Sequence, residues 1–329
     1  MSKSQHRTSQ EFGEAFRNFR KAKRFTLIET ADEILSESQL ARFERGQTKL
    51  STDLFFQVLH NINVSAQEFE STFNGYATLE GDSFTSFGIN RAFLSKNITE
   101  LDFYLGEVEI KLKNEPNKLK LQLNKIVIEA AIFLADPKRK IPKKDLEFLK
   151  HYLKNIDIWG EYETGLLQWT TNAWDQYTLA SLTAAMLSPV RLGQKTYQNE
   201  TYLIQTVLNV INAFIDHNNL SQAQRYINFL NERGINEYFL NERLTLNCHR
   251  ARLAWKSRDK SGLEMHRKNL KVFNYCGCFS LAKLVETEIH EMETELLDEE
   301  IHEMKMELKP HEKSSQKDTT SANVFTKGK

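Results

Sequence analysis

Helix-start signals are dense in the first 70 residues of this 329-residue chain. In a capping box, a Ser or Thr is followed three residues later by Glu or Gln, and the two side chains satisfy free amides at the helix start. The sequence carries this pattern at Thr26–Glu29, Ser36–Gln39 and Ser65–Glu68. The whole chain has only 13 glycines and 5 prolines, which disfavours a turn-rich β fold. The pattern predicts an all-α chain that begins with a compact set of short helices.

Five helices are expected in this N-terminal domain, residues 1–70. They are expected at about residues 12–24, 27–33, 37–45, 52–61 and from 66 onward. The third should end at Gly46, because glycine most easily takes the left-handed conformation that closes a helix. Residues 71–90 have no helical period and hold three glycines, so they are interpreted as a linker.

From residue 91 to about 309 the sequence alternates apolar helical segments with polar, Gly- or Pro-containing breaks. Successive helix pairs of about 40 residues favour a solenoid like that of tetratricopeptide repeats. A generic all-α bundle is the alternative. Residues 310–329 are rich in Lys, Ser and Thr and are expected to be a disordered tail.

The charges balance overall but are unevenly placed. The chain has 44 Lys+Arg and 44 Asp+Glu, which excludes a protein that coats nucleic acid through a strong positive field. Residues 1–25 nevertheless carry a local charge of +5, and residues 286–307 carry −9. The acidic segment contains a duplication, with Glu-Ile-His-Glu-Met at 288–292 and again at 300–304. A basic N-terminal face is therefore compatible with DNA contact.

The sequence predicts a cytoplasmic protein without a membrane segment. No apolar stretch approaches the roughly 18 residues that a membrane span needs. The N-terminus lacks the apolar core of a signal peptide. Three cysteines are too few for a disulfide framework and indicate a reducing compartment.

Residues 27–45 have the spacing of a helix-turn-helix, whose second helix enters the major groove of double-stranded DNA. On that helix Ser38, Gln39 and Arg42 are expected to face outward, while Leu40 and Phe43 face inward. Gln pairs well with adenine and Arg with guanine. Basic residues of the first helix and of the loop after Gly46 suit phosphate contacts. The candidate DNA-binding residues are Arg17, Arg20, Thr26, Ser36, Ser38, Gln39, Arg42, Arg45 and Lys49.

No pattern in the sequence argues for catalysis or for a cofactor. Cys276-Gly277-Cys278 is compatible with a redox pair or half a metal site, but no second Cys/His pair stands at zinc spacing, so incidental or core cysteines are favoured. His290 and His302 do not form the H-E-x-x-H zinc pattern. No catalytic or metal-binding residue is expected, and an enzyme is the least favoured class.

Several segments resemble known regulators. Residues 36–46, ending in Phe-Glu-Arg-Gly, resemble the recognition helix of the xenobiotic-response-element class of helix-turn-helix domains. The turn at 31–36, which has no glycine, resembles the variant found in the Rgg/GadR/MutR family of Gram-positive regulators. The segment from Trp159 to Glu163 resembles that family's Trp-Gly-x-Tyr-Glu motif. The resemblance covers about residues 10–300.

The resemblance implies a homodimeric transcription factor whose helical repeat domain binds a short peptide pheromone. Trp169, Asn209, Asn212 and Arg250 are candidate ligand contacts, chosen from their positions on helices.

Two features depart from the family pattern. Leu27 stands where the family usually has a DNA-contacting Gln, and the acidic helix end with its Lys-rich tail is additional. Leu27, together with Glu37 and Glu44 expected near DNA, favours the alternative of a peptide-binding interaction protein with a vestigial DNA-binding domain.

Overall fold

The computed structural model describes residues 9–74, 87–188 and 197–307. Within these ranges the chain forms sixteen α-helices and one short 3-10 helix, and no β-strand, so the all-α prediction is confirmed. Contacts divide the chain into two compact units, residues 1–139 and 140–329, which are described separately. No helix in the described ranges is long and apolar enough to cross a membrane.

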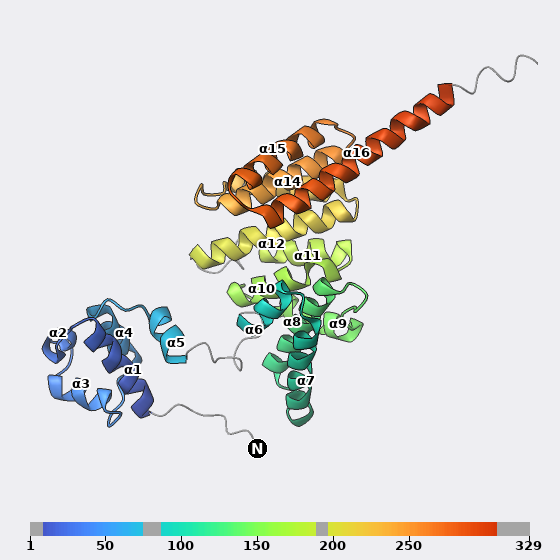
Figure 1. Cartoon of the computed structure of the whole chain (residues 1–329). Helices are drawn as coiled ribbons and strands as arrows, with labels where there is room; N and C mark the ends of the chain where they lie inside the picture. The colour runs from blue at the N-terminus through green and yellow to red at the C-terminus, as the bar shows by residue number, and fades with distance from the viewer. Residues whose placement is uncertain (1–8, 75–86, 189–196, 308–329) are drawn as a thin grey trace, which may run out of the picture. The chain divides into compact units, whose positions relative to one another are not determined.

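Five short helices open the first unit, as the sequence predicted (Figure 1). They are α1 (Ser9–Ala22), α2 (Leu27–Ala31), α3 (Glu37–Glu44), α4 (Thr52–Asn61) and α5 (Ala66–Asn74). α5 runs to Asn74 and the next helix starts at Phe87, so helices occupy both ends of the linker predicted at 71–90. Its middle, residues 75–86, lies outside the described residues, as does the expected tail at 310–329.

Local capping explains where α2 and α3 begin and end. The hydroxyl oxygens of Thr26 and Ser36 each accept the amide of the residue three positions on, and that residue's side chain accepts the amide of the cap, so both are complete capping boxes. After α3 the chain turns at Gly46, which has φ +70°. A Cβ there would lie 2.4 Å from the Cα of Gln10, so this close turn requires glycine.

Phenylalanine rings fill the core of the N-terminal domain. Phe16 and Leu40 are fully buried, and Phe43 is nearly so. The ring centroids of Phe12 and Phe69 are 5.0 Å apart in an edge-to-face arrangement, the geometry that aromatic quadrupoles favour. The prediction that Leu40 and Phe43 face inward is confirmed. Their burial determines which face of α3 is exposed to solvent.

Three further helices complete the first unit. They are α6 (Phe87–Leu94), α7 (Ile98–Asn114) and α8 (Leu119–Ala135). α8 is apolar on most sides and buried over residues 126–132. α7 packs along α8 and buries Leu101 completely, while its opposite face is exposed.

The second unit consists of paired antiparallel helices (Figure 1). They are α9 (Lys143–Asn155), α10 (Glu161–Thr170), η2 (Thr171–Ala173), α11 (Gln176–Met186), α12 (Tyr197–Asp216), α13 (Leu220–Arg233), α14 (Leu240–Lys256), α15 (Ser261–Tyr275) and α16 (Phe279–Glu307). Alternate helices α10, α12, α14 and α16 begin 36, 43 and 39 residues apart. This spacing agrees with the predicted pairs of about 40 residues.

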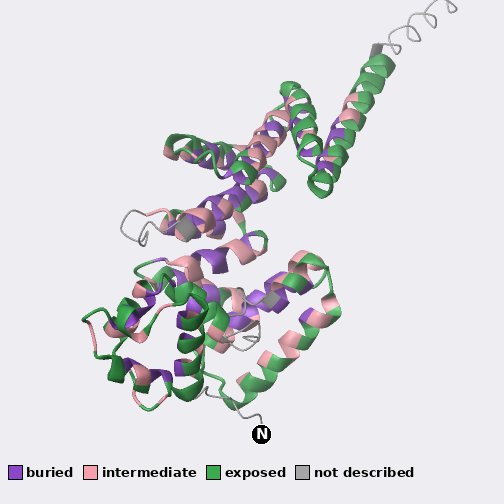
Figure 2. Ribbon diagram, turned by 60° about the vertical axis from the view of Figure 1, so that its left-hand side comes forward, coloured by how far each residue is buried: buried purple, intermediate pink, exposed green. Residues whose placement is uncertain are grey.

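Three breaks in this unit were not expected from the sequence. They fall at residues 156–160, at the 3-10 turn 171–173, and at the turn 276–278 that carries Gly277 at φ +70°. α16 then runs through both copies of the acidic duplication as one helix. Its first half packs on α14 and α15, while its second half is exposed (Figure 2).

Candidate DNA-binding surface and inner polar row

The exposed face of α3 carries three side chains that suit base recognition. Ser38, Gln39 and Arg42 are all exposed, opposite the buried Leu40 and Phe43. The side chain of Arg42 makes no hydrogen bond or ion pair with any described residue. Its guanidinium is therefore free to form the two-pronged hydrogen bond that Arg makes with guanine.

Gln39 has a second task that the sequence alone obscured. Its Oε1 accepts the backbone amide of Ser36 at 2.9 Å as part of the capping box. Bidentate recognition of adenine needs both the amide oxygen and the amide nitrogen of Gln. In this conformation only the nitrogen is uncommitted, so Gln39 must leave the cap to read adenine in that way.

Arg20 was wrongly expected on the outer, DNA-facing side of the first helix. It is only 7% exposed, and its Nε and NH2 atoms donate to the two carboxylate oxygens of Glu44 at 2.5 and 2.8 Å. Its third nitrogen donates to the carbonyl of Phe25 at 2.8 Å. With all its nitrogens committed to the interior, Arg20 is not available to a phosphate. The expectation that Glu44 stands near DNA is wrong for the same reason, because Glu44 is 5% exposed.

The remaining basic candidates of the N-terminal domain are on its surface. Arg17 lies 3.9 Å from Glu44 but keeps nearly half of its side chain exposed. Arg45 donates to Gln47 at 3.2 Å, and Lys49 is exposed in the loop before α4. These three cations can approach the negatively charged backbone of DNA.

The start of α2 shows what Leu27 does. Thr26, the N-cap, is exposed, and its backbone amide and hydroxyl both donate to Glu29, which lowers the pKa of that carboxyl. Leu27 is half-buried and packs against the aromatic core. The position where the family usually has a polar contact is thus used here for packing.

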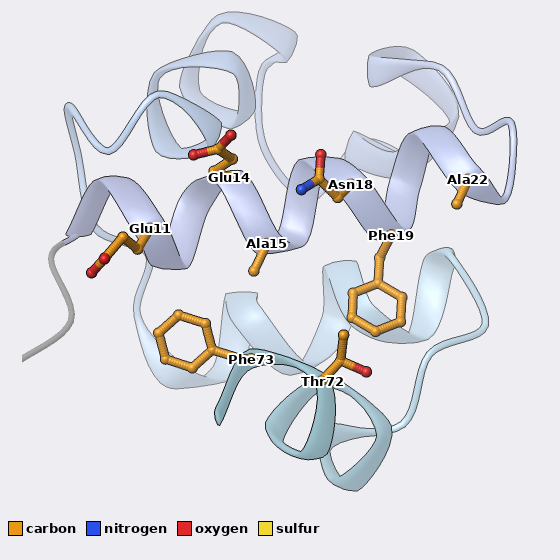
Figure 3. A pocket seen from close by; sticks show the side chains of 8 residues that line it. All are labelled: Glu11, Glu14, Ala15, Asn18, Phe19, Ala22, Thr72 and Phe73. Carbon is orange, nitrogen blue, oxygen red and sulfur yellow. The ribbon is translucent and has the colours of Figure 1, made fainter. Parts of the chain in front are cut away.

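A hollow of about 470 Å³ lies elsewhere on this domain, between α1 and α5 (Figure 3). The rings of Phe19 and Phe73 and the methyl group of Ala15 line it, with the carboxylates of Glu11 and Glu14 at its edge. None of the candidate DNA contacts lines the hollow.

A row of polar side chains joins α10, α12 and α14, the first helices of three successive pairs. Gln168 of α10 donates to Gln205 of α12 at 3.4 Å, and Gln205 donates to Glu242 of α14 at 2.9 Å. Each bond joins residues 37 positions apart in the chain. The row therefore repeats with the period of the helix pairs.

Arg252 of α14 continues this row toward α16. Its guanidinium donates to Asn212 and, at 2.6 Å, to Asp216 of α12, and its Nε lies 3.4 Å from Glu288 of α16. Asn212 also donates to Asp216 at 2.9 Å. One cation thus joins three helices. We name Gln168, Gln205, Asn209, Asn212, Asp216, Glu242, Arg252 and Glu288 the inner polar row.

The structure brings together two of the four candidate ligand contacts. Asn209 and Asn212 lie one turn apart on α12. The side chain of Asn209 is exposed and has no hydrogen-bond partner among the described residues. Trp169 is half-buried beside Gln168. Arg250 is directed away from this row, because it donates to Asn247 at 2.7 Å and to Asn231 of α13. We call α13, the second helix of its pair, an outer helix.

Sequence reasoning missed Gln205, Glu242 and Arg252. The spacing Gln205, Asn209, Asn212, Asp216 on an otherwise apolar helix marks one polar face of α12 and was a usable signal. The partners on α14 could not be assigned in the same way. They depend on which residues, nearly 40 positions away, come to lie beside α12.

Two buried histidines, His249 and His266, lie close to the charged residues of the inner polar row. Burial lowers the pKa of His249 to about 3 and that of His266 to about 4, and the positive charge of Arg252 acts in the same direction. The Nε2 atom of His266 lies 3.3 Å from Glu288, yet neither of its ring nitrogens makes a well-formed hydrogen bond within the described residues. Burial raises the pKa of Glu288.

The three cysteines fall into two environments. Cys276 and Cys278 are exposed on the turn between α15 and α16, so neither belongs to the core. Cys248 is half-buried, and burial raises the pKa of its thiol to about 12. No group of three or more potential metal ligands occurs in the described part of the chain.

The fold resembles that of solved structures over nearly its whole length. The chain matches the Streptococcus dysgalactiae SHP pheromone receptor Rgg2 at 23% identity, with a TM-score of 0.68, covering 85% of this chain and 99% of that one. It matches PrgX in its complex with cCF10 at 15% identity, with a TM-score of 0.65, covering 86% and 92%. At these identities the matches establish the shared fold.

A family match over the regulatory half supplies the identity. Residues 107–287 match the family described as the C-terminal domain of the helix-turn-helix-type transcriptional regulator Rgg. This range covers more than half of the chain and includes most of the second unit. The family consists of transcriptional regulators and is not a family of enzymes. The chain therefore belongs to the Rgg family of transcriptional regulators.

Proposed function

We propose that this chain is a sequence-specific DNA-binding regulator that acts as a homodimer and is controlled by a short peptide bound along the inner polar row. The observation that carries the proposal is the exposed face of α3, where an unpaired Arg42 stands beside Ser38 and Gln39. This face is held in place by the buried Leu40 and Phe43. A rigid helix that presents such side chains fits the major groove.

Each side chain has a distinct part in this proposal. Arg42 reads a guanine through its two-pronged donor, and Ser38 contacts a neighbouring base edge. Arg17, Arg45 and Lys49 hold phosphates and set the register without reading sequence. Two copies of α3 in a dimer would reach half-sites in successive major grooves.

Fluorescence anisotropy with the duplex upstream of the regulated gene tests the DNA arm. Arg42→Ala should weaken binding by about 1–3 kcal/mol and relax the preference at one base pair. Arg243→Ala is the matched control, because Arg243 is also exposed but lies on α14. If Arg42→Ala and Arg243→Ala bind the duplex as the wild type does, α3 is not the recognition helix.

The alternative of a vestigial DNA-binding domain has specific support in Leu27 and Gln39. Leu27 packs inward and the carbonyl oxygen of Gln39 is engaged in the cap, so two potential polar contacts are withdrawn from DNA. A true binder should lose affinity steeply between 50 and 200 mM salt, by roughly a factor of a thousand or more if six phosphates are contacted. Weak binding without this steep dependence would favour the alternative.

The inner polar row supports the peptide arm. Amide side chains such as those of Asn209 and Asn212 can donate to and accept from a peptide backbone at once. PrgX has been solved with cCF10, and Rgg2 is described as a pheromone receptor, which favours the same ligand class for this chain. Peptide binding would regulate only through a difference in affinity for two arrangements of the helices.

Isothermal titration calorimetry tests this arm with short peptides encoded beside the gene. Asn209→Ala should weaken peptide binding on the order of tenfold, because one or two hydrogen bonds are lost. Asn228→Ala, on the outer helix α13, is the matched control. Equal peptide affinities for the two variants would place the ligand elsewhere.

A further inference from the structure

The outward face of α7 carries large apolar side chains that the described residues leave exposed. Phe103 and Ile110 are 64% and 58% exposed. They are about two turns apart and lie on the same side of the helix. Gly106 stands between them, and a Cβ built there would meet no atom within 4 Å. The three residues form a smooth strip that a second helix can approach closely.

Charged side chains border this strip on both flanks. At 100° per residue, Glu100 and Lys111 lie on one flank, and Asp102 and Lys113 on the other. Lys111 and Lys113 are exposed and make no ion pair with any described residue. On each flank one acidic group is near the N-terminus of α7 and the cation is near its C-terminus; Glu107 and Glu109 lie between them, each one turn before a lysine.

This order of residues is symmetric about the point between Gly106 and Glu107. Phe103 and Ile110 lie equally far from that point, on opposite sides. The acidic pair, Glu100 and Asp102, and the basic pair, Lys111 and Lys113, also lie equally far from that point on opposite sides. A helix with such an arrangement is complementary to an antiparallel copy of itself, as an isologous two-fold interface requires.

We infer that α7 packs antiparallel on α7 of a second copy of this chain, around a two-fold axis between Gly106 and Glu107. In this contact Phe103 packs on the partner's Ile110, and the two helices cross closely at Gly106. The inference rests on the homodimer in the proposed function and assigns it an interface.

The flanking charges fix the antiparallel direction. Lys111 faces the partner's Glu100, and Lys113 faces the partner's Asp102. Within their own chain Glu100 already binds Arg91 at 2.5 Å and Asp102 binds Arg139 at 2.7 and 2.8 Å. A carboxylate has room for a further donor on each oxygen. Glu107, which lies nearest the axis, is one turn before Lys111 and is offset by it.

The free end of α16 offers an instructive contrast. Leu297, Ile301 and Met304 are also exposed at helical spacing. Their neighbours include four acidic residues, Asp298, Glu299, Glu300 and Glu303, so two copies of this face would repel each other. Charge therefore favours a second copy on α7 and disfavours one on the end of α16.

Sedimentation velocity of the full chain over a range of concentrations tests the interface. Gly106→Leu fits the free monomer, because the site is open, but it blocks the close approach. It should raise the dimer dissociation constant by roughly tenfold or more. Ile110→Glu should do the same, whereas Leu297→Glu, at an equally exposed position on α16, should not.

A charge swap tests the direction. Lys111→Glu with Lys113→Glu, and Glu100→Lys with Asp102→Lys, should each weaken self-association, and a mixture of the two proteins should form the heterodimer. Circular dichroism of each variant checks that the helices remain folded.

The outcomes separate this inference from the proposed function. A wild-type dimer that Gly106→Leu leaves intact overturns the α7 interface and leaves the homodimer standing. A monomeric wild type overturns both. A variant that changes the sedimentation coefficient without changing the mass shows that α7 covers another part of its own chain, which also overturns the inference. DNA and peptide affinities, measured on the same variants, report on the proposed function independently.

Discussion

Arg20 of α1 and Glu44 of α3 form a bidentate ion pair that is almost completely buried. Both helices contribute to the candidate DNA-binding domain, and Glu44 directly follows the buried Phe43. The pair therefore fixes α3, and with it the exposed face that carries Arg42, against α1. Arg20, which the sequence placed among the candidate phosphate contacts, instead holds α3 in place.

Removing one partner of this pair should strongly destabilise the N-terminal domain. Arg20→Ala leaves the carboxylate of Glu44 buried without its cation, which costs about 3–5 kcal/mol of unfolding free energy. Arg17→Ala is the control, because Arg17 is nearly half exposed and 3.9 Å from the same carboxylate, and it should cost less than about 1 kcal/mol. Urea denaturation measures both. Similar losses in the two variants would contradict the assigned role of Arg20.

Gly13 should not tolerate even a methyl group. A Cβ there would lie 2.2 Å from the carbonyl oxygen of Phe43, so α1 and α3 would have to separate. Gly→Ala in a free helix position stabilises by up to about 1 kcal/mol, whereas Gly13→Ala should destabilise by about 1–3 kcal/mol. Glu14→Ala, on the exposed side of the same turn, is the control and should be nearly neutral. A stabilised Gly13→Ala would show that the two helices can move apart freely.

The side-chain cap at Ser36 should contribute measurably to the stability of the N-terminal domain. Ser36→Ala removes the hydroxyl that accepts the amide of Gln39 at 3.2 Å, and should cost about 0.5–2 kcal/mol in thermal unfolding. Ser51→Ala is a matched control, because Ser51 is the N-cap of α4 but makes no side-chain cap hydrogen bond. An equal loss in both variants would mean that the observed cap bond contributes nothing.

The thiols should react in two phases. Cys276 and Cys278 are exposed, while burial raises the pKa of Cys248 to about 12, so its reactive thiolate is rare at neutral pH. Titration of the native protein with a chromogenic disulfide should therefore show two fast thiols and one slow thiol. Cys248→Ser should remove the slow phase alone. Three equally fast thiols would show that the packing of α14 against α15 and α16 does not shield Cys248.

The buried histidines should make the second unit less stable in mild acid. Their folded pKa values, about 3 for His249 and about 4 for His266, lie below the usual value of about 6.5. The unfolded chain then binds more protons between about pH 6.5 and pH 4, so the free energy of unfolding falls as the pH is lowered through this window. The raised pKa of Glu288 acts in the opposite direction and offsets part of the fall.

Denaturation at several pH values measures this dependence. His266→Gln should flatten it, while His302→Gln, exposed on α16, should leave the slope unchanged. An unchanged slope in His266→Gln would show that this histidine does not take up a proton on unfolding.

Much of the N-terminal domain could be predicted because its signals are local. The capping boxes at Thr26 and Ser36 and the turn at Gly46 involve residues within a few positions of one another. The inward direction of Leu40 and Phe43 follows from helical spacing alone. Arg20 could not be placed in the same way, because its burial depends on a carboxylate 24 positions away.

The candidate ligand site was only partly predictable for the same reason. The polar face of α12 is visible in the sequence, and two of the four proposed contacts, Asn209 and Asn212, lie on it. Arg250 and Arg252 are two positions apart on one helix, yet one contacts the outer helix α13 and the other joins α12 to α16. Which of the two faces inward is decided by the packing of α14 between its neighbours.

The duplicated segment shows the division most clearly. The sequence by itself determines that Glu-Ile-His-Glu-Met at 288–292 and at 300–304 both form one amphipathic, acidic helix, because helix propensity and spacing are the same in both copies. Only the tertiary structure decides that Ile289 and Met292 are buried while Ile301 and Met304 are exposed. The physical reason is that burial needs a surface to pack against, and α14 and α15 supply that surface to the first copy and end before the second.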